Sequence, residues 1–334
     1  MSGATTCGNA RCGRRAHAQA DRGHSCGVHQ ALAALAAHHG GVFTRTDALR
    51  TGYSAKAIRH RLAAGKWQRL FRGVYADADL ARTPRLMAAA ALLTLPASAV
   101  ISHQTAAALW ALPVEVAGEV HATVPVASGR QPVSGLVLHW ATLSAADVDR
   151  PAGIQATSAV RTVLDLARTL PCLAAVVAAD AAIHAGLVRL DELGAGLAAL
   201  TGQHGVGTAR HVVALADPGA ESPMETELRL LLVAADLPRP RTQVPIRDGA
   251  GRFLARVDLA YPEHHLAIEY DGYAAHSDRR AFRDDRRRQN DLVRAGWDLL
   301  RYTAADVRRR PAQIVAEVAE RLAAGGSHRQ RMAG

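Results

Sequence analysis

The stretch Val257-Asp258-Leu259, followed by Ala267-Ile268-Glu269-Tyr270-Asp271-Gly272, decides the fold of the C-terminal part of this 334-residue chain. It lies in two apolar runs, residues 253–260 and 266–270, which flank a polar segment at residues 261–265. Apolar runs of this length on either side of a polar turn predict a β-hairpin. If the turn is centred between Glu263 and His264, Asp258 and Glu269 face each other across the two strands.

The opposed pair Asp258 and Glu269 indicates a cation site. Side chains that face each other in a hairpin lie about 5 Å apart at Cβ, where like charges repel. A cation between them makes the arrangement favourable, and Mg²⁺ (or Mn²⁺) prefers oxygen ligands of this kind. Asp271 shares the strand face of Glu269, and His276 follows on the outgoing loop. The pattern predicts a metal-dependent phosphodiesterase site in which Asp258 and Glu269 hold the metal.

The block from Glu221 to Leu322 resembles the restriction-endonuclease-like PD-(D/E)XK superfamily, most closely its bacterial branch related to very-short-patch-repair endonucleases. The residues that carry the resemblance, in chain order, are Asp258, Glu269-Tyr270-Asp271-Gly272, His276, Asp285 and Arg288. The resemblance implies a catalytic role for each of these charged residues and for His276. The usual lysine of the superfamily is absent and Asp271 stands near its place, so the general base is either Asp271 or His276.

Glu225 is the further catalytic candidate, because the first helix of this family brings a glutamate toward the metal. The alternative is structural, since Ser222-Pro223-Met224-Glu225 has the pattern of a helix-capping box; Glu227 is the second candidate for the catalytic role. Residues 278–295 predict an arginine-rich helix with Phe282, Gln289, Leu292 and Val293 on its buried stripe. Asp285 lies at the edge of that stripe and requires a partner, either Arg301, His276 or the metal.

Composition favours a polyanionic partner. The formal net charge is +10, and all cationic side chains except Lys56 and Lys66 are arginines. Such a balance is typical of nucleic-acid binding, although a GC-rich genome also converts lysine to arginine. The four cysteines form no disulfide framework in a chain of this length. Neither a signal peptide nor a membrane-spanning run is present in the sequence, so we expect a cytoplasmic protein.

Residues 28–80 predict a winged helix-turn-helix that binds DNA. A helix follows Val28, Thr44 and Ser54 can cap two further helices, and two short strands follow around Phe71 and Arg72. In the third helix Ile58 and Leu62 share one face, and the opposite face is basic. The expected DNA contacts are Lys56, Arg59 and His60 on that helix and Arg69 and Arg72 on the wing. The alternative is a small helical domain with a solvated basic surface.

This N-terminal segment resembles the corresponding domain of AbiEi-family antitoxins. The residues that carry the resemblance are Gly41-Val42-Phe43-Thr44, Gly52-Tyr53-Ser54, Ile58-Arg59, Gly65-Lys66-Trp67 and Arg72-Gly73-Val74-Tyr75. The resemblance implies an autoregulator of transcription, with DNA, a cognate toxin or the operator of that toxin as partners.

Residues 81–216 predict a mixed α/β middle domain similar to the rest of the AbiEi-like region. We expect helices at 84–95, 102–112, 158–170, 172–185 and 191–200, and strands at 120–126 and 136–140 joined by a Gly/Pro turn. Arg161 and Asp165 predict a helical salt bridge worth a few tenths of a kcal/mol. His103 and His139 are more simply structural than catalytic.

The predicted architecture is a multidomain α/β protein. We expect a disordered leader at 1–27. Its irregularly spaced Cys and His residues fit no zinc finger. An alternative is that the gene start is over-extended and translation begins near Val28. The winged helix-turn-helix (28–80), the middle domain (81–216), the restriction-endonuclease-like domain (217–325) and a disordered tail (326–334) follow. The predicted function is a DNA-binding, Mg²⁺-dependent endonuclease in defence, toxin-antitoxin or DNA-processing roles. The alternative is a non-catalytic AbiEi-type regulator with a vestigial nuclease fold.

Overall fold

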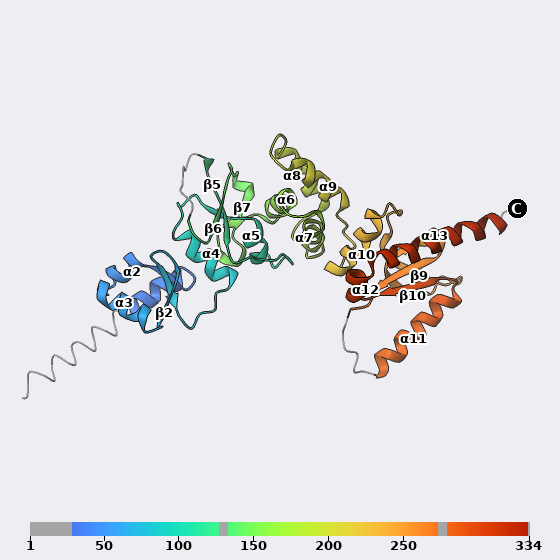
Figure 1. Cartoon of the computed structure of the whole chain (residues 1–334), viewed down its shortest axis with the longest axis horizontal. Helices are drawn as coiled ribbons and strands as arrows, with labels where there is room; N and C mark the ends of the chain where they lie inside the picture. Colours follow the sequence, from blue (N-terminus) through green and yellow to red (C-terminus); the bar gives the residue numbers. More distant parts are fainter. Residues whose placement is uncertain (1–28, 127–132, 273–278, 333–334) are drawn as a thin grey trace, which may run out of the picture. The chain divides into compact units, whose positions relative to one another are not determined.

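The computed structural model describes residues 29–126, 133–272 and 279–332 (Figure 1). The chain forms two compact units. One comprises the residues up to Trp110 together with Val116–Thr157, and the other comprises Ala111–Glu115 together with Ser158 onward. The segment 81–216, expected as one middle domain, is therefore divided at Ser158. The expected leader at 1–27 lies outside the described residues.

The first unit begins with three helices and a three-stranded antiparallel sheet. Its elements are a helix over residues 29–38, β1 (Val42–Thr44), α2 (Arg45–Arg50), α3 (Ala55–Ala63), β2 (Trp67–Phe71) and β3 (Val74–Asp77). Thr44 caps α2 in a capping box with Asp47, and Ser54 caps α3. The sheet has the order β1-β3-β2, and Phe43, Trp67 and Tyr75 pack in its core. Both caps were predicted, whereas β1 was not.

A five-stranded sheet with two helices completes the first unit. Its elements are α4 (Pro84–Leu92), β4 (Val100–Ile101), α5 (His103–Leu109), β5 (Val120–Val124), β6 (Leu136–Trp140), β7 (Val148–Asp149) and β8 (Ala156–Thr157), with strand order β6-β5-β4-β8-β7. β5 and β6 pair in parallel, with Val120 opposite Leu136. Both strands were predicted. The Gly/Pro turn expected between them falls mostly on residues 127–132, which lie outside the described residues, and the parallel pairing excludes a hairpin of these two strands.

Four helices open the second unit: α6 (Ala159–Thr169), α7 (Cys172–His184), α8 (Leu190–Ala199) and α9 (Val206–Leu215). The salt bridge between Arg161 and Asp165 forms, with Arg161 Nε 3.0 Å from Asp165 Oδ2, but both side chains are buried. The predicted salt bridge is confirmed, and its contribution of a few tenths of a kcal/mol stays a prediction, since that value applies to solvent-exposed helical pairs rather than to buried ones. α9 was not predicted.

The C-terminal part of this unit is a four-stranded sheet covered by helices on both faces. Its elements are α10 (Pro223–Ala234), β9 (Arg241–Arg247), β10 (Phe253–Tyr261), β11 (Leu266–Tyr270), α11 (Arg279–Arg294), β12 (Asp298–Tyr302), α12 (Ala304–Arg309) and α13 (Pro311–Met332). The strand order is β12-β11-β10-β9. α13 extends to Met332, so the backbone is helical through most of the segment expected as a disordered tail.

The two faces of this sheet bury different clusters. Ile268 packs with Leu228 of α10 and Val318 of α13, whereas its neighbour Ala267 packs with Leu292 of α11. Because side chains alternate along a strand, Glu269 shares the α11 face with Ala267. Val293 of α11 is 59% exposed, so its assignment to the buried stripe was wrong; on a helix it lies about 100° around the axis from Leu292.

A buried polar network joins α7 to α10. Arg229 of α10 is 0% exposed and Asp180 of α7 is 2% exposed, and Arg229 Nη2 lies 2.7 Å from Asp180 Oδ2. Thr226 Oγ1 and the Asp217 N–H also donate to the Asp180 carboxylate, at 2.8 and 2.7 Å. A charge pair is tolerated in a protein interior only with such additional hydrogen bonds. The helices α6–α9 are thus tied to the C-terminal sheet.

Candidate active site

The hairpin of β10 and β11 has the predicted register. Leu259 pairs with Ile268, and Tyr261 pairs with Leu266 around a turn of 3₁₀ helix at Pro262–His264. The next position outward places Asp258 across from Glu269. Beyond the last ladder pair, Asp258 Oδ2 accepts the Tyr270 N–H at 2.8 Å. The carboxyl group of Asp258 is therefore fixed against the end of β11.

Glu269 is 5% exposed and contacts two arginines. Arg288 Nη2 from α11 and Arg301 Nε from β12 each lie 3.1 Å from Glu269 Oε2. Burial raises the pKa of Glu269, and the two guanidinium charges oppose that rise. The parallel register of β11 and β12 explains the contact between Arg301 and Glu269, because the two residues pair in the ladder.

Asp285 has the arginine partner that its position on α11 was expected to require. Arg301 donates to both carboxylate oxygens, from Nη1 to Oδ2 and from Nη2 to Oδ1, each at 2.7 Å. Arg288 Nη2 also lies 3.1 Å from Asp285 Oδ1. The hydrogen bonds from Arg301 hold the pKa of Asp285 below its ordinary value despite partial burial. Two arginines thus bridge Glu269 and Asp285.

Asp271 lies at the edge of this group and is the most exposed of its carboxylates. Its side chain is 48% exposed, with Oδ2 at 3.7 Å from Arg301 Nε, and its N–H donates to the Tyr302 carbonyl at 2.8 Å. His276, the other candidate for the general base, lies outside the described residues. Of the two candidates, Asp271 is the one within the described residues, and it lies beside the Glu269 and Arg301 pair.

Glu225 at the start of α10 is buried and serves in part as a helix cap. Its Oε1 accepts the Ser222 hydroxyl at 2.8 Å, and its Oε2 accepts the Glu221 N–H at 3.0 Å. Oε2 also accepts Gln243 Nε2 of β9 at 3.0 Å. Gln243 was not among the predicted site residues, and only its place in the strand before the hairpin distinguished it in the sequence.

Asp258 has the largest pKa shift among the carboxyl groups of this site. Burial raises its pKa to about 6, and the negative charges of Glu225 and Glu269 add to the rise. The Tyr270 N–H and the charge of Arg288 act in the opposite direction. Three acidic side chains from α10, β10 and β11 are therefore close enough to interact electrostatically. A perturbed carboxyl beside charged partners is typical of functional sites.

The donor chemistry of this group fits Mg²⁺ or Mn²⁺. In the described ranges 29–126, 133–272 and 279–332, no group of three or more His, Cys, Asp and Glu side chains is arranged to hold a metal ion. Mg²⁺ commonly uses only one or two protein carboxylates and completes its shell with water and phosphate oxygens. Asp258 and Glu269 supply two such carboxylates, and the negative charges of Glu225 and Glu269 act on Asp258, where a cation would balance them.

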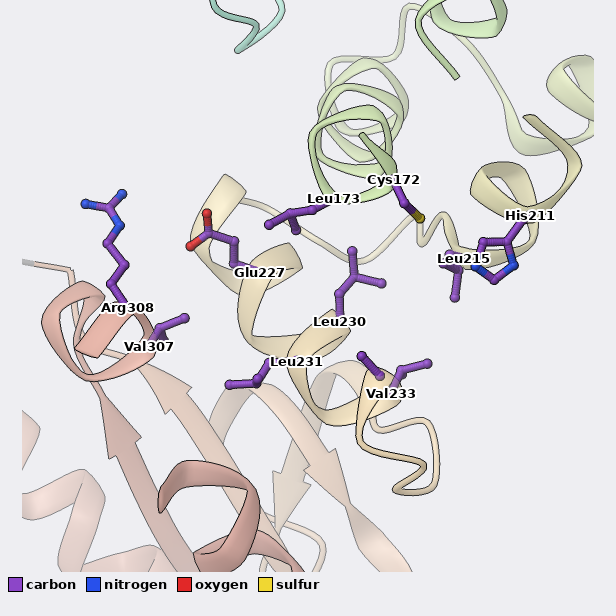
Figure 2. Close-up of a pocket in the computed structure, with 11 residues that line it drawn as sticks. Cys172, Leu173, His211, Leu215, Glu227, Leu230, Leu231, Val233, Val307 and Arg308 are labelled. Atoms are coloured by element: carbon purple, nitrogen blue, oxygen red, sulfur yellow. The ribbon is translucent and has the colours of Figure 1, made fainter. Parts of the chain in front are cut away.

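A separate pocket of about 580 Å³ lies between α7, α9, α10 and α12. Figure 2 shows its lining, which includes Leu173, Leu230 and Leu231 together with Glu227 and Arg308. The pocket is lined mainly by apolar side chains, and none of the proposed catalytic residues is part of its wall. Glu227, the second candidate for the catalytic glutamate, faces this pocket, whereas Glu225 faces the acidic group.

The predicted DNA-contact residues are all exposed. Lys56, Arg59 and His60 lie on the solvent side of α3, while Ile58 is buried. Arg69 on β2 and Arg72 in the turn between β2 and β3 are also exposed. A basic surface on a rigid helix and hairpin is therefore available for a polyanion.

The histidines of the middle region form a stack. The rings of His103 and His139 lie 3.5 Å apart between centroids, and His121 Nδ1 lies 3.1 Å from His139 Nε2. Burial lowers the pKa of His121. The packing agrees with a structural role for His103 and His139, which stays a prediction.

In the described part of the chain, no helix combines the length and the hydrophobicity that crossing a membrane requires.

Comparison with known proteins gives matches to both ends of the chain. Residues 30–76 match the family model described as "Transcriptional regulator, AbiEi antitoxin", and residues 233–322 match the REase_MTES_1575 model. A crystal structure of the RV2827C protein from Mycobacterium tuberculosis aligns with a TM-score of 0.41 and 17% identity, over 65% of this chain and 82% of that chain.

Two curated relatives cover most of the chain. They are the uncharacterized proteins MT2308 and Rv2248 of Mycobacterium tuberculosis, from strains CDC 1551 / Oshkosh and ATCC 25618 / H37Rv. Each is 34% identical over 268 residues, which is 80% of this chain and 94% of the relative. The chain therefore belongs to the family of these two mycobacterial proteins, with an AbiEi-antitoxin region at its N-terminus and a restriction-endonuclease-like domain at its C-terminus.

Proposed function

We propose that this protein binds DNA through a winged helix-turn-helix at residues 28–80 and hydrolyses phosphodiester bonds with a Mg²⁺- or Mn²⁺-dependent endonuclease domain at residues 217–325. One observation carries the catalytic part of the proposal. Four elements bring charged side chains together at the open end of the β10–β11 hairpin: α10, the two strands of the hairpin and α11. The side chains are those of Glu225, Asp258, Glu269, Asp285 and Arg288.

The proposed mechanism assigns a role to each group. A divalent cation bound at Asp258 and Glu269 supplies Lewis-acid polarisation of the phosphodiester and a water of lowered pKa. Asp271, the described candidate for the general base, orients or deprotonates the attacking water. Arg288, which is more exposed than Arg301, stabilises the charge that develops on the phosphate. Arg301 holds Asp285 and Glu269 in place.

The direct test is cleavage of supercoiled plasmid, single-stranded DNA and RNA by the purified full-length protein. We expect cleavage of DNA in Mg²⁺ or Mn²⁺ and none in EDTA. Cleavage that persists in EDTA would contradict the metal-dependent mechanism, and cleavage of RNA alone would contradict DNA as the substrate.

A non-catalytic regulator is the second candidate function. The family match of residues 30–76 favours it, and so does the pairing of Glu269 with two arginines, which balances its charge without a metal. A neighbouring gene for a nucleotidyltransferase-like toxin would support this candidate. Absence of cleavage together with binding to the protein's own promoter would decide for it.

DNA binding by α3 has its own prediction. We expect Lys56→Ala with Arg59→Ala to weaken binding of the full-length protein to duplex DNA without loss of thermal stability, because both side chains are exposed. The association constant for DNA falls as the salt concentration rises, and on a double-logarithmic plot the slope should become less steep by about 2, about one for each lost phosphate contact. Titrations at several salt concentrations measure this slope.

The matched control removes the same charge elsewhere. Arg210→Ala with Arg309→Ala also deletes two exposed arginines, and this pair should leave the slope nearly unchanged. Equal losses in both double variants would show that net charge, rather than α3, determines the affinity.

A further inference from the structure

Gln243 has a backbone conformation that strands ordinarily exclude. It lies inside β9, yet its φ is +49°. Side chains with a Cβ rarely adopt this region, which is strained for residues other than glycine and, to a lesser degree, asparagine. Strained residues persist where the surrounding structure holds them, and they concentrate at functional sites. The position of Gln243 therefore requires a reason.

The register places Gln243 beside the acidic group. Thr242 pairs with Leu259 and Val244 pairs with Val257, so Gln243 stands across from Asp258 on one side, as Glu269 does on the other. The pair of Gln243 and Asp258 is missing from the ladder, although the pairs on both sides of it are present; a separate register shift lies between Phe253 and Ala255. The side chain of Gln243 instead reaches α10, where Nε2 donates to Glu225 Oε2 at 3.0 Å.

The helix cap alone does not explain this contact. Ser222 and the Glu221 N–H already satisfy the capping role of Glu225, one on each carboxylate oxygen. The bond from Gln243 comes from a different element, the strand β9, at the residue that has the unusual φ. It fixes the direction of a carboxylate that would otherwise be held from the helix side alone.

We propose that Gln243 is a positioning residue that holds the Glu225 carboxylate against the cation site formed by Asp258 and Glu269. Glu225 then contributes negative charge to the site rather than a third ligand atom, which agrees with the absence of a three-ligand cluster among the described residues. The inference rests on the proposed nuclease function, because it assumes that Asp258 and Glu269 bind a divalent cation.

A purely structural role for Gln243 gives a different expectation. If the contact only ties β9 to α10, its loss lowers the stability of the apoprotein and leaves cation affinity unchanged. If Gln243 positions Glu225, its loss weakens cation binding while stability is retained. Two variants separate these roles. Gln243→Gly relieves the strained φ and removes the amide, and Gln243→Asn tolerates the φ but is one methylene too short to reach Glu225.

The experiment measures Mn²⁺ binding to the full-length protein by calorimetry and thermal melting in EDTA and in Mn²⁺. We expect both variants to bind Mn²⁺ about tenfold more weakly, the order of magnitude of one hydrogen bond to a charged group. The melting temperature in EDTA should hold or rise for Gln243→Gly. Asp236→Gly is the control, since Asp236 has a φ of +58° in an exposed turn after α10; it should melt at the same or a higher temperature and bind Mn²⁺ as the wild type does.

Each other outcome overturns a defined statement. If both Gln243 variants bind Mn²⁺ as tightly as the wild type does, and Asp258→Asn abolishes Mn²⁺ binding, the positioning role of Gln243 is overturned and the nuclease proposal stands. A lower melting temperature with unchanged affinity assigns Gln243 the structural role. Wild-type protein that binds no Mn²⁺ overturns the proposed function itself.

Discussion

Asp258→Asn is expected to abolish DNA cleavage and, in the same protein, the stabilisation by Mg²⁺ or Mn²⁺. The cation contributes several kcal/mol of transition-state stabilisation, so cleavage should fall on the order of a thousand-fold. A ligand at one hundred times its Kd stabilises a fold by about 2.7 kcal/mol, and this increment should vanish with the carboxylate. Plasmid cleavage and melting with and without Mn²⁺ measure the two effects.

In EDTA, the folding stability of Asp258→Asn should depend on pH differently from that of the wild type. Because burial raises the pKa of Asp258 to about 6 in the folded protein, ionising the group costs more free energy in the folded protein than in the unfolded chain, and the contribution of Asp258 to wild-type stability decreases between about pH 4 and pH 6. Asp258→Asn lacks that decrease, so it should equal the wild type below pH 4 and be more stable above pH 6. Equal stability of the two proteins at pH 7 would contradict the burial of an unbalanced carboxylate at this position.

Arg229→Met is expected to destabilise the second unit by about 3–5 kcal/mol, because it leaves the Asp180 carboxylate buried without its cation. The Asp180 side chain is 2% exposed, and burial already raises its pKa. Urea denaturation of the full-length protein measures the loss as a lower midpoint. Deleting residues 1–216 removes α7 and therefore Asp180, the partner of Arg229. We expect the remaining C-terminal sheet to lose stability by a similar amount.

Two further variants test this assignment. Asp180→Asn added to Arg229→Met removes the uncompensated charge while keeping an acceptor for the Asp217 N–H and Thr226, so it should recover much of the lost stability. Arg189→Met breaks an ion pair with Asp191 at the surface, and such exposed pairs contribute little. A large loss in Arg189→Met, or no recovery in the double variant, would argue against burial as the cause.

Local signals in the sequence predicted much of this fold. The apolar runs around residues 261–265 predicted the hairpin, and a turn centred between Glu263 and His264 predicted its register. Thr44, Ser54 and Ser222 predicted helix starts because their side chains accept the first free N–H groups. The position of Asp285 at the edge of the buried stripe predicted a partner, either Arg301, His276 or the metal, and Arg301 is its partner in the structure.

Other features depend on tertiary packing that no local pattern contains. The strained φ of Gln243 has no signal in residues 241–247, because glutamine gives no indication of a positive φ. The spacing of Arg161 and Asp165 predicts their contact but not their burial under neighbouring helices. The Gly/Pro-rich segment between β5 and β6 suggested a turn, whereas the parallel pairing of these strands is set by long-range contacts.

The position of Arg301 has a consequence for how the protein matures. β12 lies beside β11 in the sheet, although α11 separates the two strands along the chain. The bridge from Arg301 to Glu269 and Asp285 therefore forms only after residue 302 has been synthesised, whereas the N-terminal region emerges from the ribosome and folds first. Under the proposed roles, a nascent chain gains its DNA-binding surface well before it can cut, so translation order itself delays the hydrolytic activity.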